Sequence, residues 1–75
     1  MTLLDLATSQ VGQITALHGD PGFRSRLMEM GFHKGIKVRM IQKMPFNGPV
    51  KIRIRNGMIS LRQSDATNIS VRLDV

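Results

Sequence analysis

The chain has 75 residues, of which 11 are Lys or Arg and 5 are Asp or Glu, so its formal net charge is +6 at pH 7. A chain of this length forms one domain, residues 1–75, with a core worth only about 3–5 kcal/mol, which excludes a deep, water-free catalytic cavity. The absence of Cys excludes disulfides and thiolate metal sites and indicates a reducing compartment, so we expect a cytoplasmic protein. We expect neither a signal peptide nor a membrane-spanning helix, because no apolar run approaches the roughly 20 residues that cross a bilayer.

The first segments predict a helical turn and a strand. Residues 2–6 suit a single helical turn, and residues 11–18 are typical of a strand, although their alternation of polar and apolar residues is poor. Gly12 within that strand indicates a bulge or the close approach of another backbone.

A helix is predicted over residues 21–30. Asp20 can cap its first free N–H groups, Pro21 at the first helical position has no N–H to lose, and Gly31 suits the helix end. One stripe at helical spacing should face the core: Phe23, Leu27 and Met30. Two side chains fall on another face of this helix: Arg24 and Met28.

The clearest pattern is a hairpin of two alternating strands, residues 36–44 and 50–55, around a loop at residues 45–49. If Met44 pairs with Val50, one face of this hairpin is apolar and points into the core. That face holds Ile36, Val38, Met40, Val50, Ile52 and Ile54.

The other face of the hairpin is basic and holds Lys37, Arg39, Lys51, Arg53 and Arg55. The predicted register sets Arg39 opposite Arg55 and Lys43 opposite Lys51, at a cost of roughly 0.2–1 kcal/mol per like-charge pair. Nucleic acid, anionic lipid or an acidic protein patch would attract such charge. Because no aromatic platform for base stacking accompanies these residues, a solvated charged face is favoured over RNA or DNA binding.

The last third of the chain predicts two more strands. Asn56 and Gly57 signal a tight turn before a short strand at residues 58–61, and Ser64 should cap one helical turn. Residues 69–75 alternate as a half-buried last strand. Five strands and one inserted short helix predict an all-β fold, a small five-stranded barrel.

Side chains that could carry chemistry are few. The chain lacks the phosphate-binding, nucleophile-elbow and HExxH motifs, so we expect no enzyme and no catalytic residues. His18 with Asp20, and His33 with Glu29, stand at unrelated spacings, so we predict no metal and no cofactor. Most methionines are expected to fill gaps in the core: Met30, Met40, Met44 and Met58.

The loop between the hairpin strands is a candidate contact site. It consists of Pro45, Phe46, Asn47, Gly48 and Pro49. Its Pro and Gly residues make it stiff, and Phe46 at its exposed tip either packs beneath the barrel or contacts a partner. We predict a partner-binding surface that combines this loop with the outward helix residues Arg24 and Met28.

Several of these segments resemble the FeoA family. The matching stretches are RLMEMGF at residues 26–32 followed by KG at 34–35, MPFNGP at 44–49, LRQSDA at 61–66 and ISV at 69–71. They cover nearly the whole chain in order, and the departures are small: Asp65 stands where the family more often has Glu.

The resemblance implies a short cytosolic SH3-like β-barrel that binds the cytosolic GTP-binding portion of FeoB, a membrane ferrous-iron transporter, and modulates its activity. It implies no small-molecule substrate, and membrane association only through that partner. The alternative is a regulatory or nucleic-acid-binding module, because a similar SH3-like module forms the C-terminal domain of iron-dependent repressors. Those repressors read DNA with a winged-helix domain, and no helix-turn-helix pattern precedes the barrel here.

Overall fold

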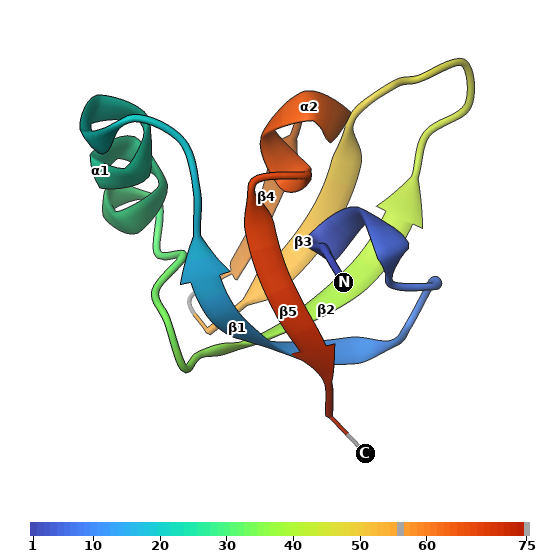
Figure 1. Ribbon diagram of the computed structural model, residues 1–75. Coiled ribbons are helices and arrows are strands. Elements are labelled where there is room, and N and C mark those ends of the chain that lie inside the picture. Colours follow the sequence, from blue (N-terminus) through green and yellow to red (C-terminus); the bar gives the residue numbers. More distant parts are fainter. Residues whose placement is uncertain (56, 75) are drawn as a thin grey trace.

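The computed structural model describes residues 1–55 and 57–74, which form one curled antiparallel sheet with three short helices (Figure 1). The strands are β1 (Val11–Leu17), β2 (Lys37–Lys43), β3 (Val50–Ile54), β4 (Gly57–Leu61) and β5 (Ile69–Leu73). The helices are η1 (Leu3–Asp5), α1 (Pro21–Glu29) and α2 (Gln63–Ala66). The sheet order is β4-β3-β2-β1-β5, and α2 connects the two edge strands. The predicted all-β architecture with an inserted short helix is confirmed.

The inner face of the curled sheet encloses the core. The apolar face predicted for the hairpin is confirmed, since Val38, Met40, Val50, Ile52 and Ile54 are all buried, while Ile36 is half-buried against them. The other buried side chains come from η1, β1, α1, the loop after α1, β4, α2 and β5: Leu3, Leu6, Ile14, Leu27, Phe32, Leu61, Ala66, Ile69 and Val71. Among the described residues no polar side chain is buried, so the domain is stabilised chiefly by apolar burial.

The start and end of α1 follow the predicted signals. The Asp20 carboxylate accepts a hydrogen bond from the Phe23 N–H at 2.9 Å, and Gly31 adopts a left-handed φ of +108°. The helix ends at Glu29, however, so Met30 is its C-cap and is 38% exposed. The prediction that Met30 faces the core was wrong, because Phe32 beyond the turn takes that place and is fully buried.

The register of the β2–β3 hairpin differs from the prediction. Arg39 lies opposite Arg53 rather than Arg55, and Lys51 lies opposite Gln42 rather than Lys43, because the register shifts between Met40 and Gln42. A shift of one residue in a single strand is a β-bulge. At Arg39 the observed register differs from the predicted one by two residues. A shift of two residues keeps each side chain on the same side of its strand, so the apolar and basic faces remain as predicted.

Two further methionines predicted to be buried are exposed. Met44 lies beyond the end of β2 and is 41% exposed, and Met58 is 51% exposed. Met58 lies on the edge strand β4 opposite Arg53, which places it on the outer face of the sheet. Of the four methionines assigned to the core, only Met40 is buried.

The C-terminal segments contain two other errors of prediction. Ser64 does not cap α2, because the helix begins at Gln63 with Arg62 at the N-cap position. Leu73, which the alternation placed with Ile69 and Val71 on the apolar side of the last strand, is 40% exposed, since it ends β5 opposite Gly12, which has no side chain to cover it. Gly12 is a site of close backbone approach, as predicted, because a Cβ there would lie 3.2 Å from the Arg72 carbonyl oxygen. Asn56 and Val75 lie outside the described residues.

We expect Gly31→Ala to destabilise the domain more than the matched control Gly35→Ala. Both glycines have left-handed φ angles, +108° and +95°, so each substitution should cost about 1–2 kcal/mol of backbone strain. A Cβ at Gly31 would also lie 2.7 Å from Cδ1 of Ile54, whereas nothing lies within 4 Å of one at Gly35.

The Ile54→Val substitution removes that Cδ1 atom and isolates the contact. Urea unfolding should show an extra loss of about 1 kcal/mol for Gly31→Ala in the original chain, and this extra loss should disappear in the Ile54→Val background. Equal losses for the two glycine variants, or an extra loss that persists without Cδ1, would contradict the proposed contact.

Candidate functional site

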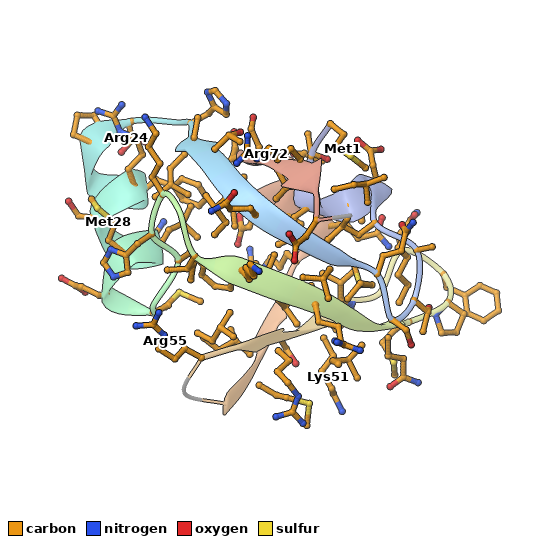
Figure 2. The ribbon with its side chains drawn as sticks, turned by 90° about the horizontal axis from the view of Figure 1, so that it is seen from below. Met1, Arg24, Met28, Lys51, Arg55 and Arg72 are labelled. Atoms are coloured by element: carbon orange, nitrogen blue, oxygen red, sulfur yellow. The ribbon has the colours of Figure 1, made fainter. Side chains whose placement is uncertain are left out.

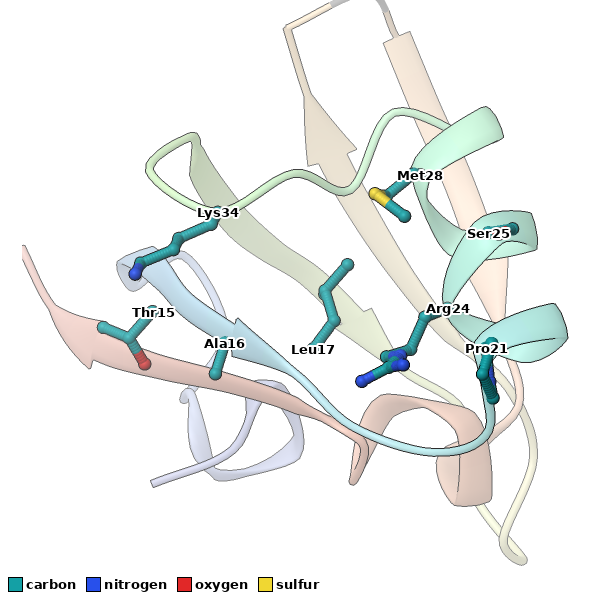
Figure 3. A pocket seen from close by; sticks show the side chains of 8 residues that line it. All are labelled: Thr15, Ala16, Leu17, Pro21, Arg24, Ser25, Met28 and Lys34. Atoms are coloured by element: carbon teal, nitrogen blue, oxygen red, sulfur yellow. The ribbon is translucent and has the colours of Figure 1, made fainter.

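An open groove of about 420 Å³ separates α1 from β1 (Figure 3). Its lining residues come from β1, α1 and the turn before β2: Thr15, Ala16, Leu17, Pro21, Arg24, Ser25, Met28 and Lys34. Leu17 and Met28 give the groove apolar walls, and Arg24 and Lys34 place cationic groups along it (Figure 3). Such a groove fits an extended segment that offers apolar and acidic side chains.

The helical repeat explains why Arg24 and Met28 face this groove together. They lie four residues apart on α1, and Leu27 on the adjacent face is buried and holds the helix against the sheet. Arg26 lies on a different side of the helix, where its guanidinium sits 5.6 Å from the centre of the Phe23 ring. The structure therefore brings the two predicted helix residues together.

The loop at residues 45–49 lies on the opposite side of the molecule from α1 (Figures 1 and 2). The Met44 N–H donates to the Pro49 carbonyl and the Gly48 N–H to the Pro45 carbonyl, both at 3.1 Å. The Phe46 side chain is 100% exposed, so its ring does not pack beneath the barrel. The residues predicted as one partner-binding surface are thus divided between two separate surfaces, the groove and the loop.

The basic residues of the hairpin alternate with its buried residues and so lie on the outer side of the sheet. Figure 2 shows two of them, Lys51 and Arg55. Arg39, Arg53 and Arg55 are exposed, and Lys37 forms an ion pair of 3.1 Å with Asp74. We use the name basic face for Lys37, Arg39, Lys51, Arg53, Arg55 and Arg72.

The sequence patterns did not predict that Arg72 belongs to the basic face. Arg72 lies opposite Gln13, which lies opposite Lys37, so Arg72 is on the same side of the sheet as the basic residues of the hairpin, with β1 between them. Its Nε and Nη2 atoms donate to the Gln13 Oε1 atom at 3.1 and 2.7 Å. The alternation in residues 69–75 placed Arg72 on the polar side of its strand, but nothing in the sequence identified the neighbouring strand.

The histidines considered as metal ligands lie apart from any cluster. The His18 Nε2 atom is hydrogen-bonded to the Ser70 hydroxyl at 2.7 Å, and the Asp20 carboxylate caps α1. Within residues 1–55 and 57–74 no three His, Asp or Glu side chains are grouped closely enough to hold a metal ion. In the same residues, no helix has both the length and the apolar character needed to cross a bilayer.

A family model described as FeoA domain matches residues 1–73. The chain is 38% identical over 73 residues to the Fe(2+) transport protein A/Fe(2+) transporter FeoB fusion protein of Porphyromonas gingivalis strain W83. That match covers 97% of this chain but only 9% of the fusion protein, so the chain spans less than a tenth of that relative.

Solved structures share the fold. A FeoA protein from Stenotrophomonas maltophilia, solved with zinc and described as a prokaryotic SH3 domain protein, is 30% identical with a TM-score of 0.82, and the match covers 96% of this chain and 89% of that one. A manganese-dependent transcriptional repressor is 17% identical with a TM-score of 0.89, and the match covers 99% of this chain and 41% of that one. The repressor shows likeness of fold alone. Because the family model spans residues 1–73, the resemblance seen in the sequence is confirmed, and the chain belongs to the FeoA domain family.

Proposed function

We propose that this chain is a non-catalytic accessory domain of ferrous-iron uptake that binds the cytosolic portion of a FeoB-type transporter and modulates its activity. The observation that carries the proposal is the fusion protein of Porphyromonas gingivalis, in which a segment 38% identical to this chain shares one polypeptide with FeoB. A covalent linkage raises the effective concentration of two modules that act on each other. When the modules are separate chains, a binding surface has to replace the linkage.

The groove between α1 and β1 is the surface that we assign to this binding. It combines apolar walls at Leu17 and Met28 with the cations Arg24 and Lys34, and its volume of about 420 Å³ admits several side chains of a partner segment. Arg is enriched among the residues that contribute most to binding energy. An acidic and apolar segment of the transporter would match both features.

The loop at residues 45–49 is assigned a separate role, because it lies on the other side of the molecule from the groove. A single short segment cannot occupy both surfaces. The chain also carries no phosphate-binding loop, so nucleotide turnover in the complex belongs to the transporter. The proposed cytoplasmic location follows from that partner.

We expect Arg24→Gln to weaken binding to the isolated cytosolic portion of FeoB by about tenfold or more, because it removes a cation from the groove. The matched control is Arg26→Gln, which makes the same chemical change two residues along α1, where the guanidinium lies over the Phe23 ring. Titration of each variant, with and without guanine nucleotide, measures the difference.

Met28→Ser tests the apolar part of the same groove. Met28 is 41% exposed and supplies an apolar wall, so we expect a loss of affinity without loss of folding. If Arg24→Gln and Met28→Ser both bind as tightly as the original chain, the groove is not the docking surface. If the original chain fails to bind in every nucleotide state, the proposed function itself is wrong.

A further inference from the structure

The tip of the loop at residues 45–49 exposes apolar side chains that the fold does not use. Phe46 is 100% exposed, and Met44 at the base of the loop is 41% exposed. Pro45 and Pro49 are exposed as well. Together these neighbouring side chains form an exposed apolar patch, and such patches mark sites of contact with other molecules.

The backbone of the loop holds the Phe46 ring outward in a strained conformation. Phe46 and Asn47 have φ angles of +58° and +59°, in the left-handed region that a bulky residue such as Phe rarely adopts. Hydrogen bonds from the Met44 and Gly48 N–H groups close the loop, and the Gln63 side chain donates to the Gly48 carbonyl at 3.1 Å. Strain of this kind is retained where the surrounding structure enforces it, and it is concentrated at functional sites.

Basic side chains lie on both sides of the loop in the sequence. Lys43 is the last residue of β2 and is exposed, while Lys51 follows the first residue of β3. From Lys51 the basic face continues along the outer side of β3 to Arg53, and Arg55 follows the last residue of that strand, at the end of the hairpin away from the loop. The basic face holds six cations, and within residues 1–55 and 57–74 the acidic side chain that lies beside it is Asp74, which is paired with Lys37.

We propose that this loop and the basic face bind the surface of an anionic lipid bilayer, with the Phe46 ring inserted at headgroup depth. The apolar tip projects beyond the cations at its base, which matches a bilayer surface, where charged headgroups lie outside the acyl chains. A nucleic-acid surface would need stacking platforms among the cations, and no aromatic side chain belongs to the basic face. The proposal differs from the expectation that membrane contact runs only through the partner, and it requires no transporter.

A single introduced tryptophan tests the insertion directly. The chain contains neither Trp nor Tyr, so Phe46→Trp creates one fluorophore at the loop tip. With vesicles of phosphatidylcholine and phosphatidylglycerol at low salt, its emission should shift to shorter wavelength, and the shift should be absent with phosphatidylcholine alone. The matched control, Met28→Trp, places the fluorophore in the groove on the other side of the molecule and should show no shift.

Two further variants separate the apolar and electrostatic contributions in vesicle sedimentation. Phe46→Asn removes the ring while keeping a residue that tolerates the left-handed backbone, and we expect about tenfold weaker binding. Arg39→Gln combined with Arg53→Gln should weaken binding by roughly 25-fold, at about fivefold per cation removed. Arg24→Gln should bind vesicles as the original chain does, and thermal melts verify that each variant is folded.

The proposal is overturned if Phe46→Trp shows no shift with anionic vesicles, or if the variants of the loop and basic face bind vesicles as tightly as the original chain. Binding of single-stranded RNA that depends on Phe46 and Arg53, without vesicle binding, would assign the surface to nucleic acid instead. Because the vesicles contain no transporter, these results are independent of the groove and of its partner.

Discussion

Burial of one side of the β2–β3 hairpin is the constraint on which the rest of the structure depends. Val38, Met40, Val50 and Ile52 are at most 1% exposed, and they alternate with side chains that point outward. In a domain of 75 residues the core supplies only a few kcal/mol of net stability, so no strand can turn this face toward water. The inward face therefore fixes the outward one, which carries Arg39 and Arg53 opposite each other.

The same constraint explains why the functional features lie around the edges of the core. The curled sheet fills its interior with apolar side chains, and no polar side chain is buried in the part of the chain described by the structure. What remains available is the groove beside α1, the loop between β2 and β3, and the outer side of the sheet, all of which suit binding.

The sequence predicts best those structural features that depend on a single short-range rule. The two-residue alternation predicted the apolar face of the hairpin, and Asp20 and Gly31 predicted the start and end of α1 within one residue. The bulge between Met40 and Gln42 could not be predicted, because no Gly or other local signal marks it and it arises from the pairing of whole strands. The exposure of Met58 likewise depends on β4 being an edge strand.

The sequence predicted individual residues of the candidate site but not how they group into surfaces. Helical periodicity correctly placed Arg24 and Met28 together, and the Pro and Gly residues correctly predicted the loop. Neither pattern contains information on the distance between the helix residues and the loop. Lys34 joins the groove because the turn before β2 lies beside β1, and Arg72 joins the basic face because β1 lies between β2 and β5 in the sheet. Long-range pairing of this kind is invisible in a single sequence.

The most direct test of the separation between groove and loop is the footprint of the transporter on this chain. Amide chemical shifts measured by NMR during titration with the cytosolic portion of FeoB should change along β1 at Ala16 and Leu17 and along α1 from Arg24 to Met28. The amides of Phe46 and Arg53 should stay unchanged. A footprint centred on the loop or on the basic face, with the groove unaffected, would contradict the account.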